Sequence, residues 1–175
     1  MSQPKTRTDA FAADMVAALG TKCGLEWHCG KPTKGNRECV DVIGSRNKKD
    51  WVLIEVELRR GTPLGNVVKV WSQISRETEN GNGRLGKKVI LFQAFSRFYQ
   101  KKGKGKKGTK RSNAEFVGHE MASACRRVSY IPLSMDYFPA RKRPGRSVTR
   151  GGRRRKYHAT KLARRIVSRL RALRF

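Results

Sequence analysis

The sequence predicts an α/β (α+β) protein in which a mixed central sheet is flanked by helices and followed by a basic C-terminal arm. Three observations indicate this class. Segments with helical periodicity alternate with segments of strand periodicity over about 130 residues. Residues 87–95 are apolar almost throughout, as strands are when both faces of their sheet are covered. The last part of the chain, by contrast, is polar, basic and rich in Gly and Pro.

The first expected element is a helix over residues 8–20, which Thr8 or Asp9 can cap and Gly20 can end. Its apolar stripe consists of Phe11, Met15, Val16 and Leu19. Three strands are then expected, over residues 24–29, 38–43 and 51–58. The polar segment between the second and third strands favours a hairpin.

The second half of the core continues the alternation. We expect helices over residues 65–79 and 113–125, strands over 87–95 and 127–133, and the start of a short helix over 96–100. Residues 140–157 are expected to be disordered without a partner, because they are polar and highly charged. Helical periodicity returns over residues 159–174. We therefore divide the chain into a core domain, residues 1–138, and a basic tail, residues 139–175.

The helix expected in the tail is amphipathic. Its apolar stripe consists of Leu162, Ile166, Leu170 and Leu173, and arginines cover much of the remaining surface. We favour docking of the stripe on the core or on a partner, with the arginines presented to phosphates. The alternative is a helix that lies on an anionic membrane surface.

The charge of the chain indicates a polyanionic partner. Its 175 residues include 41 Lys and Arg against 13 Asp and Glu, a net charge of +28. Such a charge repels itself in a compact monomer. Nucleic acid is the best match, because each neutralised phosphate also releases condensed counterions. An acidic membrane surface is the alternative.

Most of the excess charge lies in two segments. Residues 101–111 hold seven basic residues and residues 140–175 hold fifteen, without an acid in either. The rest of the chain has 19 basic residues beside all 13 acids, an ordinary balance. The candidate nucleic-acid-binding residues are Lys101, Lys102, Lys104, Lys106, Lys107, Lys110, Arg111, Arg153, Arg154, Arg155, Lys156, Arg164 and Arg165.

No segment resembles a signal peptide or a membrane-spanning helix, which favours a cytoplasmic, nucleoid-associated location without a membrane partner. The four cysteines are then expected to be reduced. Zinc ligation by Cys23, His28, Cys29 and Cys39 is an alternative, but no tight C-x2-C pair is present, so buried thiols are favoured.

Acidic residues inside apolar strands carry the most chemical information. Side chains of a strand alternate between its faces, so one face of residues 51–58 carries Trp51, Leu53, Glu55 and Glu57. In the expected hairpin, Asp41 lies beside Glu55. Buried carboxylates side by side are costly, and a divalent metal ion would offset that cost. The alternative is a solvated strand edge where Arg59 or Arg60 neutralises the acids.

The spacing of these acids resembles a known motif. Asp41, thirteen further residues and then Glu55-Val56-Glu57 resemble the D…(D/E)-x-K motif of the PD-(D/E)xK, or restriction-endonuclease-like, nuclease superfamily. The expected helices and strands of residues 8–95 are similar to that family's α-β-β-β-α-β order. Glu57 departs from the motif's lysine. Some restriction enzymes carry Glu there, and other members take the lysine from a neighbouring helix, where Lys69 shares a face with Asn66 and Gln73.

The resemblance implies a restriction-endonuclease-like core and an endonuclease that hydrolyses phosphodiester bonds with Mg²⁺ or Mn²⁺, with DNA favoured over RNA. Asp41, Glu55 and Glu57 are then the metal ligands and Lys69 stabilises the transition state, the four together forming the catalytic set. Asp14 and Glu26 are weaker candidates. A homodimer would suit cleavage of two strands. The alternative function is a non-catalytic basic nucleic-acid-binding protein: ribosome-associated, architectural, or a degenerate nuclease fold.

Overall fold

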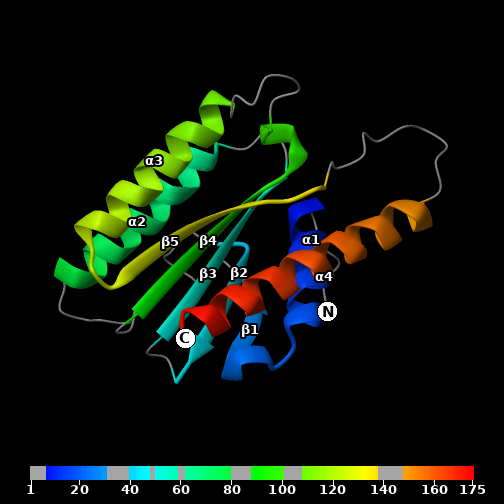
Figure 1. The fold of residues 1–175 in the computed structure, drawn as a ribbon, viewed down its shortest axis with the longest axis horizontal. Coiled ribbons are helices and arrows are strands. Elements are labelled where there is room, and N and C mark those ends of the chain that lie inside the picture. Colours follow the sequence, from blue (N-terminus) through cyan, green and yellow to red (C-terminus); the bar gives the residue numbers. More distant parts are fainter. Residues whose placement is uncertain are drawn as a thin grey trace.

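The fold is a five-stranded mixed sheet flanked by four α-helices (Figure 1). The computed structural model describes residues 7–30, 40–47, 50–58, 62–79, 88–100, 108–137 and 148–175. Within these residues the helices are α1 (Arg7–Leu19), α2 (Pro63–Glu79), α3 (Thr109–Ala124) and α4 (Val148–Ala172), with short 3-10 helices η1 (Lys22–Gly24) and η2 (Arg97–Tyr99). The strands are β1 (Glu26–Cys29), β2 (Val42–Arg46), β3 (Asp50–Glu57), β4 (Lys88–Phe95) and β5 (Val128–Ser134). The predicted α/β class is confirmed.

The five strands lie side by side in chain order. β1, β2 and β3 are antiparallel, whereas β3, β4 and β5 are parallel. Parallel neighbours need a crossover connection, and α2 and α3 belong to these crossovers. The carboxyl ends of the three parallel strands therefore lie at one end of the sheet, where Glu57 pairs with Phe95 and Phe95 with Ser134.

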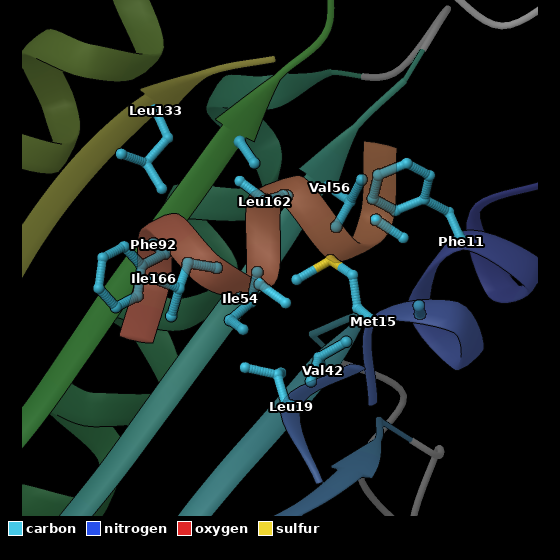
Figure 2. Packing of buried hydrophobic residues seen from close by; sticks show 14 of the residues in the cluster. Phe11, Met15, Leu19, Val42, Ile54, Val56, Phe92, Leu133, Leu162 and Ile166 are labelled. Atoms are coloured by element: carbon cyan, nitrogen blue, oxygen red, sulfur yellow. The ribbon is translucent and has the colours of Figure 1, made fainter. Parts of the chain in front are cut away.

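Each face of the sheet carries its own hydrophobic core. α1 and α4 pack on one face, and Figure 2 shows Met15 of α1 and Ile166 of α4 beside Ile54 and Phe92 of the sheet. α2 and α3 lie side by side on the opposite face (Figure 1). β4, which lies between β3 and β5, is buried on both faces apart from Lys88. This agrees with the apolar run that predicted the strand.

α1 shows one correct and one wrong boundary prediction. Gly20 follows the helix with φ +53, a left-handed conformation that favours glycine, as expected for its C-terminal end. Thr8 and Asp9 were predicted to cap the start, but both lie inside the helix, which includes Arg7. Asp9 instead lies in the first turn, where a carboxylate interacts favourably with the helix dipole.

The boundary of β2 differs from the prediction, which placed a strand over residues 38–43. β2 begins at Val42, and Asp41 lies in a bend directly before it rather than inside it. The reason is that the Asp41 carboxylate, not a backbone carbonyl, accepts the N–H of Val56 on β3. The hairpin itself is confirmed, since β2 and β3 pair in antiparallel register.

The start of α4 also corrects the sequence prediction. Residues 140–157 were expected to be disordered, yet α4 begins at Val148, and residues 140–147 lie outside the described part of the chain. Contacts with distant residues hold this first part of the helix. Arg155 forms an ion pair with Asp14 of α1 at 2.7 Å, and the ring of His158 packs against Tyr137 at a centroid distance of 5.2 Å.

The apolar stripe of α4 docks on the core, as the sequence favoured. Leu162, Ile166 and Leu170 are almost wholly buried with α1 and the sheet. Leu173, predicted as the last member of the stripe, is 41% exposed because the regular helix ends at Ala172. Among the described helices, none is both long enough and apolar enough to cross a membrane.

Candidate active site

Two carboxylates lie on β3 where the strand leaves the core formed with α2 and α3. Leu53 belongs to this core, and Glu55 and Glu57 follow it at alternate positions on the same face, as predicted. Both acids are buried, with only 5% and 3% of their surface exposed. Buried carboxylates are rare without a partner, so their surroundings indicate what the site can do.

The carboxylate of Asp41 is fixed to the backbone of β3. Its Oδ2 accepts the N–H of Val56 at 2.7 Å, and its own carbonyl accepts the N–H of Gly30 at 3.0 Å. Only glycine fits at position 30, because a Cβ there would lie 1.7 Å from the carbonyl oxygen of Val40. These contacts hold Asp41 beside Glu55, as the hairpin predicted.

Asp41 and Glu55 form a hydrogen-bonded carboxyl pair. Burial raises the pKa of Asp41 to about 6, against the lowering effect of the Val56 N–H. Burial also raises the pKa of Glu55 well above its ordinary value, and the charges of Asp41 and Glu57 raise it further. The hydrogen bond favours the ionised form of Asp41 and the protonated form of Glu55. Glu55 therefore holds the proton that the pair shares.

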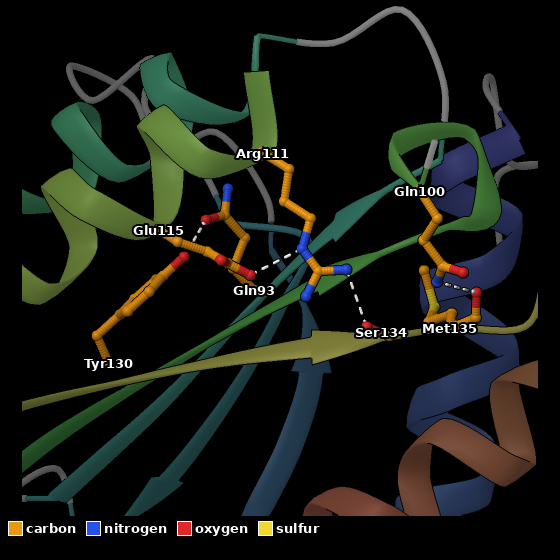
Figure 3. Close-up of polar contacts among 7 residues, drawn as sticks. All are labelled: Gln93, Gln100, Arg111, Glu115, Tyr130, Ser134 and Met135. Carbon is orange, nitrogen blue, oxygen red and sulfur yellow. Dashed lines mark hydrogen bonds and ion pairs between the residues drawn. The ribbon is translucent and has the colours of Figure 1, made fainter. Parts of the chain in front are cut away.

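Glu57 is held by amide donors instead. Its Oε1 accepts from Asn66 Nδ2 of α2 at 2.9 Å and from Gln93 Nε2 of β4 at 2.8 Å. Gln93 also donates to the carbonyl of Pro63 at 2.8 Å and accepts from the Tyr130 hydroxyl at 2.6 Å, a contact drawn in Figure 3. Burial raises the pKa of Glu57, and the two amides lower it. The network fixes the orientation of Glu57 across three strands and α2.

Lys69 is the basic group of the site. It lies on α2 one turn after Asn66, as the helical spacing predicted, and its side chain is exposed. Its positive charge lowers the pKa of both Glu55 and Glu57, which places the ammonium within electrostatic reach of both. Gln73, one further turn along, is partly buried.

The three acids have no direct cationic partner in the described part of the chain. The ion pairs found there involve other acids. Arg59 and Arg60, the partners in the solvated-edge alternative, lie outside the described residues. The cost of burying Glu55 and Glu57 and of half-burying Asp41 is therefore met, within the described structure, by protonation, by amide and N–H donors and by the nearby charge of Lys69.

Sequence reasoning missed Gln93 and Tyr130. The available signal was Gln93, the single polar residue in the apolar run of residues 89–95, since a glutamine buried between two helix layers needs a polar partner. Tyr130 reaches Gln93 because its ring packs on Gly118 of α3, where a Cβ would lie 2.4 Å from the ring. No local sequence pattern shows that contact. Asp9 was also missed as a neighbour whose charge raises the pKa of Asp41.

Other candidate ligands lie elsewhere or outside the described residues. Asp14 is engaged by Arg155, and Glu26 is exposed on β1. Cys23 and Cys29 are half-buried, and Cys39 lies outside the described residues. Across the described stretches, no group of three or more His, Cys, Asp or Glu side chains is arranged as a ready-made metal site.

The predicted nucleic-acid-binding residues fall into three groups. Lys101, Lys102, Lys104, Lys106 and Lys107 lie outside the described residues. Lys110 of α3 and Arg153, Arg154, Lys156, Arg164 and Arg165 of α4 are exposed. The third group has protein partners: Arg155 pairs with Asp14, and Arg111, only 8% exposed, binds Glu115 at 2.7 Å and Ser134 Oγ at 2.8 Å (Figure 3).

The raised pKa values predict how stability depends on pH. Since burial raises the pKa of Asp41 from 3.8 to about 6, the folded state holds a proton that the unfolded state has already released between these values. The contribution of Asp41 is full below about pH 4 and is lost as pH rises through about 6, by at most about 3 kcal/mol. Urea unfolding in EDTA at pH 4.5 and pH 7 measures this loss.

Asp41→Asn is the comparison for that measurement. Asparagine keeps an oxygen for the Val56 N–H but does not titrate, so the variant is expected to lose less stability between the two pH values. Titrating groups away from the carboxyl pair, such as His158, act equally in both proteins. Equal pH dependence in the wild type and the variant would contradict the assignment.

Comparisons of the chain with protein-family models, with curated proteins and with solved structures found no match in any of the three.

Proposed function

We propose that the protein is a metal-dependent nuclease that hydrolyses phosphodiester bonds, with a restriction-endonuclease-like core and DNA as the favoured substrate. The observation that carries the proposal is the carboxyl pair of half-buried Asp41 and buried Glu55, with Glu57 and Lys69 beside it, in a chain of net charge +28. A protein that only binds phosphates gains nothing from burying acids, because carboxylates repel phosphate. A site that binds both a cation and a phosphate does use them.

The element order supports the restriction-endonuclease-like core. A helix, three antiparallel strands, a helix and a parallel strand follow one another from α1 to β4. The same α-β-β-β-α-β order is typical of the PD-(D/E)xK superfamily. The spacing of Asp41, Glu55 and Glu57 resembles the motif of that superfamily. The acids also lie close together at one end of the β2–β3 hairpin. Asp41 lies in the bend before β2, and Glu55 and Glu57 lie at the end of β3.

The residues present fit a hard divalent cation such as Mg²⁺. Asp41 and Glu55 offer carboxylate oxygens, the ligands that Mg²⁺ prefers. A bound cation would replace the proton that the two carboxyls share in its absence. Glu57 is the third candidate ligand, with one oxygen engaged by amides. A bound metal would supply a water of lowered pKa and positive charge near the scissile phosphate.

The remaining roles belong to the chain's own residues. Asn66 and Gln93 hold the Glu57 carboxyl in one orientation. There its charge is close enough to Asp41 and Glu55 to raise the pKa of both. Lys69, the exposed base next to the acids, can contact a phosphate that approaches from solvent and stabilise charge that develops on it. The motif has a lysine at the position of Glu57. In the proposed site, Lys69 supplies that lysine's charge from α2.

The proposal is tested with labelled duplex, branched and single-stranded DNA and with RNA, each incubated in Mg²⁺, in Mn²⁺ or in EDTA. Cleavage of at least one substrate that depends on the metal and stops in EDTA supports a nuclease. Salt-sensitive binding without cleavage in either metal would overturn it and leave a non-catalytic nucleic-acid-binding protein.

Replacement of Lys69 tests the role of α2. Lys69→Ala is expected to lower the cleavage rate by about 10²–10³-fold, because a charged donor aimed at the transition state is lost. Arg76→Ala, which removes an exposed charge further along the same helix, is the matched control and should change the rate by less than about threefold. Rates at saturating substrate measure the effect. Equal cleavage rates for the two variants would mean that Lys69 contributes only to the overall positive charge of the protein and not to the catalytic site.

A further inference from the structure

A basic hollow with an exposed aromatic ring lies on the outer face of α4. Helical spacing brings its lining residues onto one face, opposite the stripe that docks on the core. The hollow has a volume of about 510 Å³ and is lined by Arg153, Lys156, Tyr157, Thr160, Lys161 and Arg164. The predicted nucleic-acid-binding residues include three of these basic residues, Arg153, Lys156 and Arg164, but not Tyr157.

Tyr157 is the residue that sets this surface apart from an ordinary solvated helix face. Its side chain is 64% exposed, between Arg153 and Lys161 on the neighbouring turns. Lysine and arginine are stable in water on any surface, whereas a large ring gains little from exposure. A ring among positive charges is the arrangement by which proteins bind single strands: the charges follow the phosphates and the ring stacks on a base.

A second hollow shares Lys161 with the first and reaches the carboxyl end of β5. This second hollow, of about 300 Å³, is also lined by Arg97, Arg165 and Ser134, and by Asp136, which pairs with Arg97 at 3.3 Å. Arg165 donates a hydrogen bond to the carbonyl of Ser134, which anchors this part of α4 to the end of β5. The surface therefore runs from α4 to the carboxyl ends of the parallel strands.

The second hollow lies at the same end of the sheet as the proposed catalytic residues, whose side chains lie on the opposite face, toward α2 and α3. Ser134 pairs with Phe95, and Phe95 pairs with Glu57 in the neighbouring strand. Neighbouring strands are about 4.8 Å apart, so Ser134 lies about 10 Å from the strand that carries Glu55 and Glu57.

We propose that the outer face of α4 binds a single-stranded segment of nucleic acid, with one base stacked on Tyr157. The proposal rests on the proposed function and deepens it, because it names a substrate with an unpaired segment, such as a flap or a branch. In a continuous duplex every base is already stacked on its neighbours, so the ring of Tyr157 would have no base face to meet.

The test measures binding in EDTA, where no cleavage takes place. Fluorescence anisotropy at one fixed salt concentration compares a labelled single-stranded oligonucleotide, as DNA and as RNA, with the duplex of the same sequence. Tyr157→Ala is expected to weaken single-strand binding about 5- to 150-fold for at least one of the two sugars, and duplex binding by less than about twofold. Tyr157→Phe, which keeps the ring, should stay within about twofold of the wild type.

Phe116→Ala is the matched control, since Phe116 is an equally exposed ring, 66% exposed, on α3. It should leave binding unchanged. No loss in Tyr157→Ala, an equal loss on duplex and single strand, or an equal loss in Tyr157→Phe would overturn the proposal. Because the readout is binding without metal, that failure leaves the cleavage test untouched, and absence of cleavage leaves the binding result standing.

Discussion

Glu55→Gln is expected to reduce metal-dependent cleavage by at least about 10²–10³-fold, while binding of nucleic acid in EDTA stays within about twofold of the wild type. Glu55 is buried and shares a proton with Asp41. Glutamine keeps the shape and can donate to Asp41 as the protonated carboxyl does, so the fold is retained. The change removes the negative charge that a divalent cation would need. Cleavage rates in Mg²⁺ and anisotropy in EDTA measure the two effects.

Glu120→Gln is the control for this substitution. Glu120 is an exposed acid on α3, and its replacement makes the same Glu-to-Gln change without touching the carboxyl pair. It should leave the cleavage rate within about twofold. If Glu55→Gln cleaves as fast as this control, the carboxyl pair is not the catalytic site, even if the protein cleaves nucleic acid by other residues.

Ile166→Ala is expected to lower the free energy of unfolding by about 2–5 kcal/mol. Ile166 has no exposed surface and packs with α1 and the sheet, so its truncation leaves a cavity in the core where α4 docks (Figure 2). The size of this loss shows that α4 belongs to the folded unit. Urea unfolding followed by circular dichroism measures it.

Leu173→Ala, in the turn that follows the same helix, provides the contrast. Its side chain is 41% exposed, so the loss should be below about 0.5 kcal/mol. A small loss for Ile166→Ala, similar to that for Leu173→Ala, would mean that α4 does not contribute to the stability of the core. The basic tail would then fold and unfold independently of residues 1–138.

Most of the fold could be predicted because local periodicity determines it. The alternation of residues 51–58 and the apolar run of residues 87–95 each correspond to a strand within one residue at either end. The start of α4 could not be predicted in this way. Gly151, Gly152 and the arginines that follow have the composition of a disordered segment, and the contact that orders them joins Arg155 to Asp14, 141 residues away.

In the candidate site, too, local sequence patterns predicted some features, whereas contacts between distant residues could not be predicted. The shared face of Glu55 and Glu57 follows from strand alternation, and the place of Asp41 follows from the hairpin, so both were available from sequence. The hydrogen bonds that orient Glu57 were not. Gln93 and Tyr130 come from strands that are distant in the chain, and sequence alone does not show which strands become neighbours.

The two faces of α4 would link the proposed nucleic-acid binding to folding. Its inner face completes the core with α1, and its outer face lines up the ring and the charges only while the helix is formed. A strand bound there selects the folded state, so it stabilises the whole domain by about 2.7 kcal/mol at a hundredfold excess over its dissociation constant. Unfolded basic chain also attracts phosphate, which reduces this gain. If the proposed function holds, substrate is also a folding ligand, and its binding relieves the self-repulsion of a +28 chain.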